Sequence, residues 1–502
     1  MKKKYHKTIE KRKRSIEKRL KRKNYVNQAE PMIKDLNIGY EVAERMRAVG
    51  YGGIGAIHKM VCKLGLDRGI NESLKLFKAH LPYHESDHVL NIAYNVLSGG
   101  TRLEDIERLR QDESYMDGLG AQRIPDPTTS GDFLRRFNAE DLLKLQEAIN
   151  GTRKAVWERQ DEEFLEEGII DVDGTIAGTT GECKGGMDIS YKGIWGYAPL
   201  LVTLANTKEV LYLVNRPGNK KSSEGAAEWM DRAIEVVGSA FRKVWVRGDT
   251  DFSLTKHLDG WSERVSFVFG YDSMPNLVKL ADELGKKAWK RLNRPAKYEV
   301  KTEEVRERPE NVKERVVRER EYRNLRLLSE EVAEFRYRPG ACEKYYRMIV
   351  VRKNLSVEKG EVRLFDDVRY FFYITNDWEK TKDEIVFFAN DRCNQENVIG
   401  QLKSGVNAMR MPSSDLNSNW AYMVTATLAW NLKAWYGLLT PDKVKGEEIV
   451  RMEFKRFLMS FMQIPCQIVK TGRRIVFRVL AYSAELKTFL RTFEHFKQMT
   501  PI

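Results

Sequence analysis

The sequence predicts an α/β fold in which a mixed sheet is flanked by helices and preceded by a helical N-terminal domain. Residues 31–160 have apolar groups at helical spacing, interrupted by Gly and Pro. From Gly168 onward the pattern changes to short β-rich runs. A charged stretch with its own strands then interrupts those runs. At 502 residues the chain is long enough for two to four domains, each with its own core.

The positive charge of the chain is concentrated at its start. The net charge is +14, and residues 1–24 hold thirteen Lys or Arg against Glu10 and Glu17, which leaves only +3 for the rest. A basic arm over residues 1–30 attracts polyanions through counterion release, and duplex DNA is the usual partner. A solvated, partly helical tail that aids solubility would have the same composition. The arm lacks the apolar anchors of a membrane-surface helix.

Residues 31–160 are predicted to be a helical DNA-binding domain. Apolar spacing indicates helices at 57–64 and 87–97, and a further helix over 133–149. Three residues could cap that last helix, namely Thr129, Ser130 and Asp132. Several short helices with Gly breaks suit a helix-turn-helix-like unit, but they suit any small helical domain equally well.

The first part of the core is placed at residues 161–274. We expect strands at 169–173, 198–203 and 209–214, a helix over 223–237 capped by Ser222 or Ser223, a strand at 243–247, a helix at 254–261 and a strand at 265–269. The order strand, strand, strand, helix, strand, helix, strand is that of an RNase H-like sheet.

An insertion domain is predicted at residues 275–365. Lys301–Arg323 is dominated by Lys, Arg and Glu without apolar periodicity, as in a solvated helix or a flexible loop. Hairpin strands are expected at 334–338 and 345–351, on either side of Pro339-Gly340. The core resumes at 366–440 with a strand at 370–375 and a helix over 384–404, and a C-terminal region with a hairpin and a helix occupies 441–502.

Cysteine use and hydropathy limit where the protein can function. The five cysteines are scattered and form no CxxC pair, which argues for a reducing compartment and against a zinc ribbon or a disulfide framework. Trp420–Leu439 is the best membrane candidate, but Asn431 and Lys433 interrupt it. We therefore interpret it as a buried amphipathic helix.

Carboxylates follow two of the expected core strands. Asp171 and Asp173 lie two apart and so point to one face of a strand. Because a buried strand normally excludes Asp, the pair favours a compensating cation such as Mg²⁺, although a strand-end or turn role explains it equally well. Asp249 follows the strand at 243–247, and ligand sites in open α/β sheets lie beyond such strand ends. Asp251 is expected to be a turn or helix-cap residue.

A third acidic residue, Glu396, falls on the expected helix over 384–404. Arg392 and Glu396 are four residues apart and Lys403 is seven further on, so all three lie along one helical stripe. An ion pair on a solvated face would explain the first two. A site in which Glu396 binds metal while Arg392 and Lys403 hold phosphates explains all three.

Together the three segments resemble the catalytic motifs of bacterial insertion-sequence DDE transposases. The motifs are Asp-x-Thr from Asp173, Arg-x-Asp-x-x-Phe from Arg247 and Arg-x₃-Glu-x₆-Lys from Arg392. With the run Gly196–Leu201, their spacing is most similar to insertion-sequence family thirteen-eighty, which is related to the hairpin-forming transposases. The resemblance extends over roughly residues 45–480.

The resemblance implies a catalytic and metal-binding triad of Asp173, Asp249 and Glu396, with two Mg²⁺ ions that Mn²⁺ can replace. Asp171 remains a rival for Asp173, although Thr175 favours Asp173. The resemblance further implies DNA contacts, which with the basic arm we assign to Arg392, Lys403, Lys11, Arg12, Lys13 and Arg14. The family often has Tyr where this chain has Ala389, so any contact of that Tyr is not carried over.

The implied activity is that of a cut-and-paste transposase, which cleaves DNA at transposon ends and transfers the strands to target DNA. The implied partner is double-stranded DNA, both terminal inverted repeats and target, bound by a homodimer in a synaptic complex at the bacterial nucleoid in the cytoplasm. Two alternatives stay open: a catalytically inactive DNA-binding protein derived from a transposase, and an RNase H-like nuclease acting on RNA or a junction.

Other constellations carry less weight. His80, His84 and His88 have the spacing of metal ligands on one helix, but Pro82 lies between the first two and no Cys or fourth ligand is close, so zinc is not expected. The tryptophans at 420, 430 and 435 are expected in the core. Trp195 or Trp261 could stack on an unpaired base.

Overall fold

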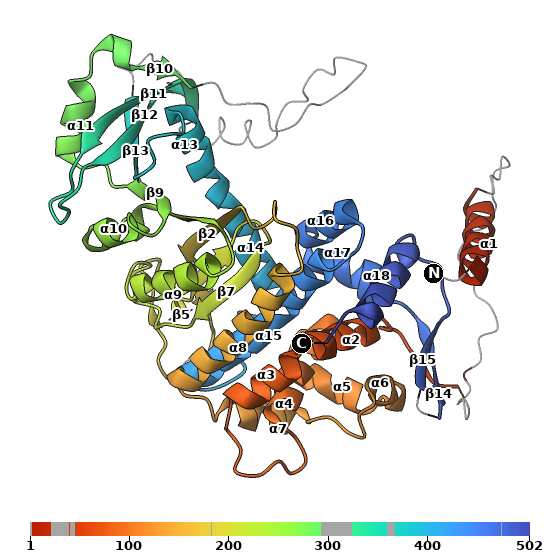
Figure 1. Ribbon diagram of the computed structural model, residues 1–502. Coiled ribbons are helices and arrows are strands. Elements are labelled where there is room, and N and C mark those ends of the chain that lie inside the picture. The colour runs from red at the N-terminus through yellow and green to blue at the C-terminus, as the bar shows by residue number, and fades with distance from the viewer. Residues whose placement is uncertain are drawn as a thin grey trace. The chain divides into compact units, whose positions relative to one another are not determined.

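The computed structural model, shown in Figure 1, describes most of the chain, namely residues 3–21, 40, 46–181, 183–292, 324–358, 367–472 and 474–501. The chain divides into two compact units, each formed by segments that are distant in sequence. The first unit comprises residues 1–166, 174–220 and 395–502, and the second comprises 167–173 and 221–394. The charged stretch 301–323 lies outside the described residues, as does most of 22–45.

Short helices form the N-terminal part of the first unit. They are α2 (Ile54–Leu64), α3 (Leu66–Ser73), α4 (Glu85–Leu97), α5 (Ile106–Arg110), α6 (Glu113–Leu119), α7 (Pro127–Leu134) and α8 (Ala139–Trp157). The helices expected at 57–64 and 87–97 are confirmed as α2 and α4. The single helix expected over 133–149 is wrong. Asp126 caps α7 through the N–H of Thr129, and Asn138 caps α8 through the N–H of Asp141, so two helices meet where one was expected.

Helix α15 (Leu416–Leu438) runs through the core of the first unit. Every residue from Ser418 to Gly437 is buried, so the helix is enclosed on all sides and the expected amphipathic face is wrong. Trp420, Trp430 and Trp435 are at most 5% exposed, which confirms them as core residues. Among the described residues, no helix combines the length and the apolar character needed to cross a membrane.

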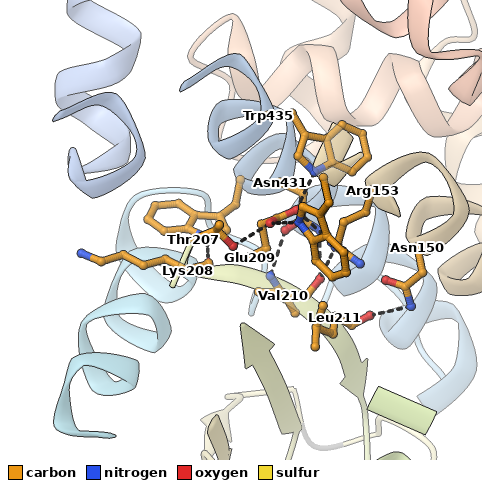
Figure 2. A network of polar contacts seen from close by, with 11 residues as sticks. Asn150, Arg153, Thr207, Lys208, Glu209, Val210, Leu211, Asn431 and Trp435 are labelled. Carbon is orange, nitrogen blue, oxygen red and sulfur yellow. Dashed lines mark hydrogen bonds and ion pairs between the residues drawn. The ribbon is translucent and has the colours of Figure 1, made fainter. Parts of the chain in front are cut away.

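A buried polar network joins α8 and α15 to the strand β7 (Glu209–Val214), which pairs antiparallel with β6 (Leu200–Leu204) (Figure 2). The carboxylate of Glu209 is fully buried and accepts four hydrogen bonds. The donors are Arg153 Nε at 2.9 Å, Trp157 Nε1 at 2.9 Å, Trp435 Nε1 at 2.6 Å and the Thr207 hydroxyl at 2.6 Å. Asn431 of α15 also bonds both backbone groups of Val210. Since an unpaired buried charge is costly, these bonds fix two helices to one strand.

A mixed sheet forms the centre of the second unit, with the strand order β10-β11-β12-β13-β9-β8-β2. The strands are β2 (Glu167–Gly174), β8 (Lys243–Gly248), β9 (Ser266–Tyr271), β10 (Lys290–Arg291), β11 (Asn324–Tyr337), β12 (Tyr346–Glu358) and β13 (Asp367–Thr375). Strands β2, β8 and β9 are parallel to one another. Strand β13 pairs antiparallel with β9 on one side and with β12 on the other, and β12 pairs antiparallel with β11. The predicted α/β class, a mixed sheet flanked by helices and preceded by a helical domain, is confirmed and is consistent with an RNase H-like fold.

The hairpin expected in the insertion extends this same sheet. Strands β11 and β12 pair antiparallel around Pro339-Gly340, and β12 continues the pairing to β13 and so to β9. Helix α13 (Lys382–Asn390) packs against this sheet, with Ile385 and Val386 in one core cluster with Trp245 of β8. The insertion therefore adds strands to the sheet that carries β8, while its limits at 275 and 365 stay a prediction.

Two helix predictions differ in detail from the structure. Helix α9 (Ala226–Gly238) begins after Gly225, whose φ is +70°, and neither Ser222 nor Ser223 caps it. The helix expected over 384–404 is not continuous. It consists of α13, a 3₁₀ turn at Asp391–Cys393, and α14 (Asn394–Ser404). Thr381 and Glu384 form a capping box at the start of α13.

Helices α10 (Thr255–Trp261), which confirms the helix expected at 254–261, and α11 (Pro275–Asp282) belong to the second unit. The other helices and strands belong to the first unit. They are α1 (Lys3–Leu20), β1 (Ala48–Val49), β3 (Ala177–Gly178), β4 (Asp188–Ile189), β5 (Trp195–Tyr197), α16 (Lys443–Arg451), α17 (Phe454–Phe457), β14 (Cys466–Thr471), β15 (Arg474–Val479) and α18 (Leu486–Gln498). Strands β14 and β15 pair antiparallel, which confirms the C-terminal hairpin.

Candidate catalytic carboxylate site

The ends of β2 and β8 bring two of the predicted ligands to one edge of the sheet. In this parallel pair, Asp171 of β2 is opposite Arg247 of β8. Asp173 and Asp249 each follow two residues later, so both carboxylates leave the sheet at the carboxyl ends of neighbouring strands. The sequence predicted the two strand ends separately, and the pairing register of β2 and β8 places these ends side by side.

A buried ion pair fixes that register. Arg247 Nε lies 2.7 Å from Asp171 Oδ1 and Arg247 Nη2 lies 2.9 Å from Oδ2, with both side chains at most 4% exposed. The third nitrogen, Nη1, donates to the carbonyl of Phe388 in α13 at 2.8 Å. Burial raises the pKa of Asp171, and Arg247 opposes that rise. Because Arg247 engages both Asp171 oxygens, the geometry favours Asp173 over Asp171 as the carboxylate that is available to a metal ion.

Asp173 and Asp249 share one neighbouring cation, Arg392. Arg392 Nη1 lies 3.5 Å from Asp173 Oδ2, and both side chains are 16% exposed. Burial raises the pKa of Asp249; Arg392 lowers it, and the adjacent Asp251 raises it further. Arg392 therefore faces two carboxylates at the sheet edge, where a bidentate cation also suits a phosphate.

Two close backbone contacts shape the turn that carries Asp249. Its Oδ1 accepts the N–H of Asp251 at 3.0 Å and begins a 3₁₀ turn over Thr250–Phe252. A Cβ at Gly248 would lie 2.7 Å from the Phe252 Cβ, and one at Gly270 would lie 3.0 Å from the Thr250 nitrogen. The turn thus packs against β9 only because both positions are glycine. Asp251 is exposed and lies in the turn, as expected.

The donor atoms at this edge fit a hard divalent cation. Asp173 and Asp249 offer carboxylate oxygens, which Mg²⁺ and Mn²⁺ prefer over sulfur or imidazole donors. Burial penalises the negative charge of Asp249 and so raises its pKa, and a bound cation would offset that penalty. The residues present therefore suit such an ion.

Glu396 and Lys403 lie on α14 of the first unit. This helix buries Gln395, Val398, Ile399 and Leu402, and it leaves Glu396 and Lys403 exposed. Lys403 Nζ donates to the carbonyl of Ile176 at 2.8 Å, and desolvation together with nearby Lys192 lowers its pKa. Arg392 lies in the preceding 3₁₀ turn, so it is not on the same α-helix as Glu396 and Lys403, and the shared stripe stays a prediction.

The basic residues predicted for the arm lie on α1. Lys11 and Arg14 are exposed, Lys13 lies 3.9 Å from Glu17, and Arg12 donates to the carbonyl of Val479. Ile9 is 4% exposed, so the helix is not solvated on every side. The contact of these four basic residues with DNA stays a prediction.

Of the two tryptophans proposed to stack on a base, one is excluded. Trp261 is 1% exposed, and its indole N–H donates to Asp231 at 3.0 Å, so that alternative is wrong. Trp195 is 51% exposed and remains available.

Sequence reasoning missed the role of Arg247. The residue was noted only as part of a motif, yet it links β8, β2 and α13. An arginine inside an expected buried strand needs a partner, and Asp171 was the one buried acid expected on a neighbouring strand. The sequence shows both charged residues, but it does not show the strand register that places them opposite each other.

Paired carboxylates beyond neighbouring parallel strands, next to an arginine, are typical of enzymes that use metal ions on phosphodiesters. A family model described as Transposase DDE domain group 1 matches residues 46–501. The chain belongs to this family of DDE transposases.

Comparisons with individual proteins add little. No curated protein matches the chain. Among solved structures, the chain is similar to a piggyBac transposase, from a cryo-EM structure of its synaptic complex with hairpin DNA. The TM-score is 0.38 and the identity 11%, over 82% of this chain and 81% of that one.

Proposed function

We propose that this DDE transposase cleaves DNA at transposon ends and transfers the freed strands to target DNA in a cut-and-paste reaction. The observation that carries the proposal is the register of β2 and β8, in which the Asp171–Arg247 pair sets Asp173 and Asp249 at one sheet edge. Membership of the DDE transposase family over residues 46–501 supports it.

We assign Asp173, Asp249 and Glu396 as the metal ligands. Two divalent ions, Mg²⁺ or Mn²⁺, would supply activation of the attacking hydroxyl and stabilisation of the leaving oxygen. The strand ends hold Asp173 and Asp249 in place, and the exposed face of α14 offers Glu396. Arg392 and Lys403 would bind DNA phosphates, Arg392 through two N–H groups and Lys403 as a point charge.

The proposed partners are the terminal inverted repeats and the target, both double-stranded DNA, bound by a homodimer in a synaptic complex. The thirteen basic residues within 1–24 support a phosphate contact, with Lys11, Arg12, Lys13 and Arg14 as its described centre. The motif spacing and the Gly196–Leu201 run support placement in insertion-sequence family thirteen-eighty.

Two other functions predict different behaviour. A derived DNA-binding protein without catalysis would be expected to lack a carboxylate, and this chain has all three. A nuclease acting on RNA would cut an RNA duplex or a junction as readily as a terminal repeat. Neither alternative has an observation of its own in its favour.

The test is strand cleavage of a DNA duplex that carries the terminal repeat, with Mg²⁺ present. We expect Asp249→Asn and Glu396→Gln each to abolish cleavage while the protein still binds the duplex. Asp251→Asn is the matched control, because this exposed acid lies two residues from Asp249 and should leave cleavage unchanged. If either triad variant cuts as well as the parent, the assignment of that residue is wrong.

A further inference from the structure

Three potential metal ligands gather at the beginning of α4, away from the carboxylates described above. The ligand atoms of His80, His84 and Glu85 all lie within 4.8 Å of one another. His80 and His84 belong to the irregular segment between α3 and α4, and Glu85 is the first residue of α4. The spacing of four suggested a single helix, but this segment is not helical, and it brings the two histidines to a glutamate instead.

His88, the third histidine of that spacing, belongs to the core. It is 2% exposed, and its ring stacks on Phe133 with the centroids 4.5 Å apart. The group is therefore two histidines and one glutamate. With three protein ligands, a water would complete the tetrahedral coordination, an arrangement found in zinc sites that are open to solvent rather than in closed structural ones.

Glu85 is held in a fixed orientation by the backbone. Its side chain is 1% exposed, and Oε1 accepts the N–H groups of Leu76 at 3.0 Å and Phe77 at 3.2 Å. The other oxygen, Oε2, lies 3.1 Å from His80 Nε2. One oxygen is thus anchored while the other faces the histidines, which is how outer hydrogen bonds orient a metal-binding carboxylate.

The two imidazoles are positioned close together at the surface. Their rings stack with centroids 3.9 Å apart and an interplanar angle of 18°, so one exposed imidazole has to rotate on binding to aim its in-plane nitrogen lone pair at the same ion as the other. The His80 side chain is 38% exposed and His84 is exposed, so water reaches both. Two imidazole nitrogens and a carboxylate oxygen suit Zn²⁺ much better than Mg²⁺, which takes mainly oxygen ligands.

We propose that His80, His84 and Glu85 bind one Zn²⁺ ion, which joins the segment Leu74–His84 to the start of α4. The site lies outside the proposed DNA-cleaving machinery and shares no residue with it. Since α4 is almost wholly buried, a metal at its first turn would stabilise the helical part of the first unit against local opening.

The first test is calorimetric titration of the metal-free, full-length protein with Zn²⁺ in excess Mg²⁺, which occupies carboxylate-only sites. We expect one tight equivalent for the parent and binding weaker by about tenfold or more in His80→Ala and His84→Ala. His257→Ala is the control, since His257 is exposed and lies in another part of the chain. Equal affinity in His84→Ala and the parent, or an equal loss in the control, would overturn the proposal.

A second measurement identifies the ligand atoms. Co²⁺ in place of Zn²⁺ should give visible absorption bands without thiolate charge transfer, lost in His84→Ala and retained in Cys62→Ser. Cys62 is the informative control because its sulfur lies 3.7 Å from His58 Nε2, and this His–Cys contact could also attract the ion. Asp249→Asn should keep the bands whether or not it cleaves DNA. Thiolate charge transfer that disappears in Cys62→Ser would refute the site.

Discussion

Among the residues that the structure describes, two buried carboxylates are each bound by an arginine, Glu209 in the first unit and Asp171 in the second, and their hydrogen-bond donors differ. Glu209 accepts bonds from four side chains on three segments, so any one donor is a fraction of its support. Both oxygens of Asp171 accept hydrogen bonds from Arg247, which also donates to the carbonyl of Phe388 in α13. The first arrangement fastens helices to a strand, whereas the second sets the register of the strands that end in Asp173 and Asp249.

The largest expected effect is that of Arg247→Met. It leaves the Asp171 carboxylate buried without its cation, a change that typically costs about 3 to 5 kcal/mol of unfolding free energy. Urea unfolding measures that loss, and cleavage of terminal-repeat DNA should disappear as well. Combining it with Asp171→Leu should restore much of the stability, because a well-packed apolar pair can replace a buried ion pair. Cleavage should stay lost, since the bond to Phe388 is absent; its full return would contradict a role of Arg247 at the site.

Glu209→Gln should have a smaller effect, on stability alone. Glutamine keeps one acceptor oxygen for the surrounding donors but leaves Arg153 without a counter-charge, so we expect a loss of about 2 to 3 kcal/mol. Cleavage per folded molecule should match the parent under conditions where both are folded. Trp435→Phe, which removes one of the four donors, should cost only about 1 kcal/mol. A larger loss for Trp435→Phe than for Glu209→Gln would contradict shared support of the carboxylate.

Gly270→Ala tests the turn that carries Asp249, which lies close to the Asp171–Arg247 ion pair in the sheet. The added Cβ would lie 3.0 Å from the Thr250 nitrogen and 3.2 Å from the Asp249 carbonyl carbon, so the turn must shift by a few tenths of an ångström. We expect cleavage to fall by about tenfold to a hundredfold, since small misplacements of reacting groups are costly. The melting temperature should change little. Gly260→Ala, with open space around its Cβ, is the control and should affect neither.

The last prediction concerns how stability depends on pH, through the buried amine of Lys433 in α15. It donates to the carbonyls of Val450 and Met452, and burial lowers its pKa from 10.5 to about 7. Between pH 7 and pH 10 the unfolded chain therefore holds a proton that the folded chain has released, so this lysine makes stability rise with pH. Unfolding of the parent and Lys433→Met across that range should show the parent gaining relative to the variant. Parallel pH profiles would show that Lys433 stays charged in the fold.

Local patterns predicted most strands and helices, because alternation, apolar spacing and turn residues act over a few positions. The strand ending in Asp173, the strand before Asp249 and the hairpin around Pro339-Gly340 are of this kind. The helix over 133–149 failed because Asp126 and Asn138 both cap, and apolar spacing does not show which cap prevails.

The features that position the carboxylates depend on long-range pairing. Asp171 and Arg247 are 76 residues apart, and Arg153 and Glu209 are 56 apart. A sequence shows each charge but not the strand register or helix packing that joins them. Glu85 was overlooked for a related reason, since its partner His80 comes from an irregular segment for which helical spacing is no guide.

The equal spacing on β2 and β8 has a consequence for how such a chain can change through descent. Each member of the Asp171–Arg247 pair stands two residues before a carboxylate of the proposed site, so one residue inserted or deleted within either short interval would turn that carboxylate to the opposite side of the sheet. Exchanging the side chain of Val172 alters packing only. Across descendants that remain functional, we expect substitutions to accumulate in these intervals and their length to stay constant, while the loop after β9 is free to lengthen.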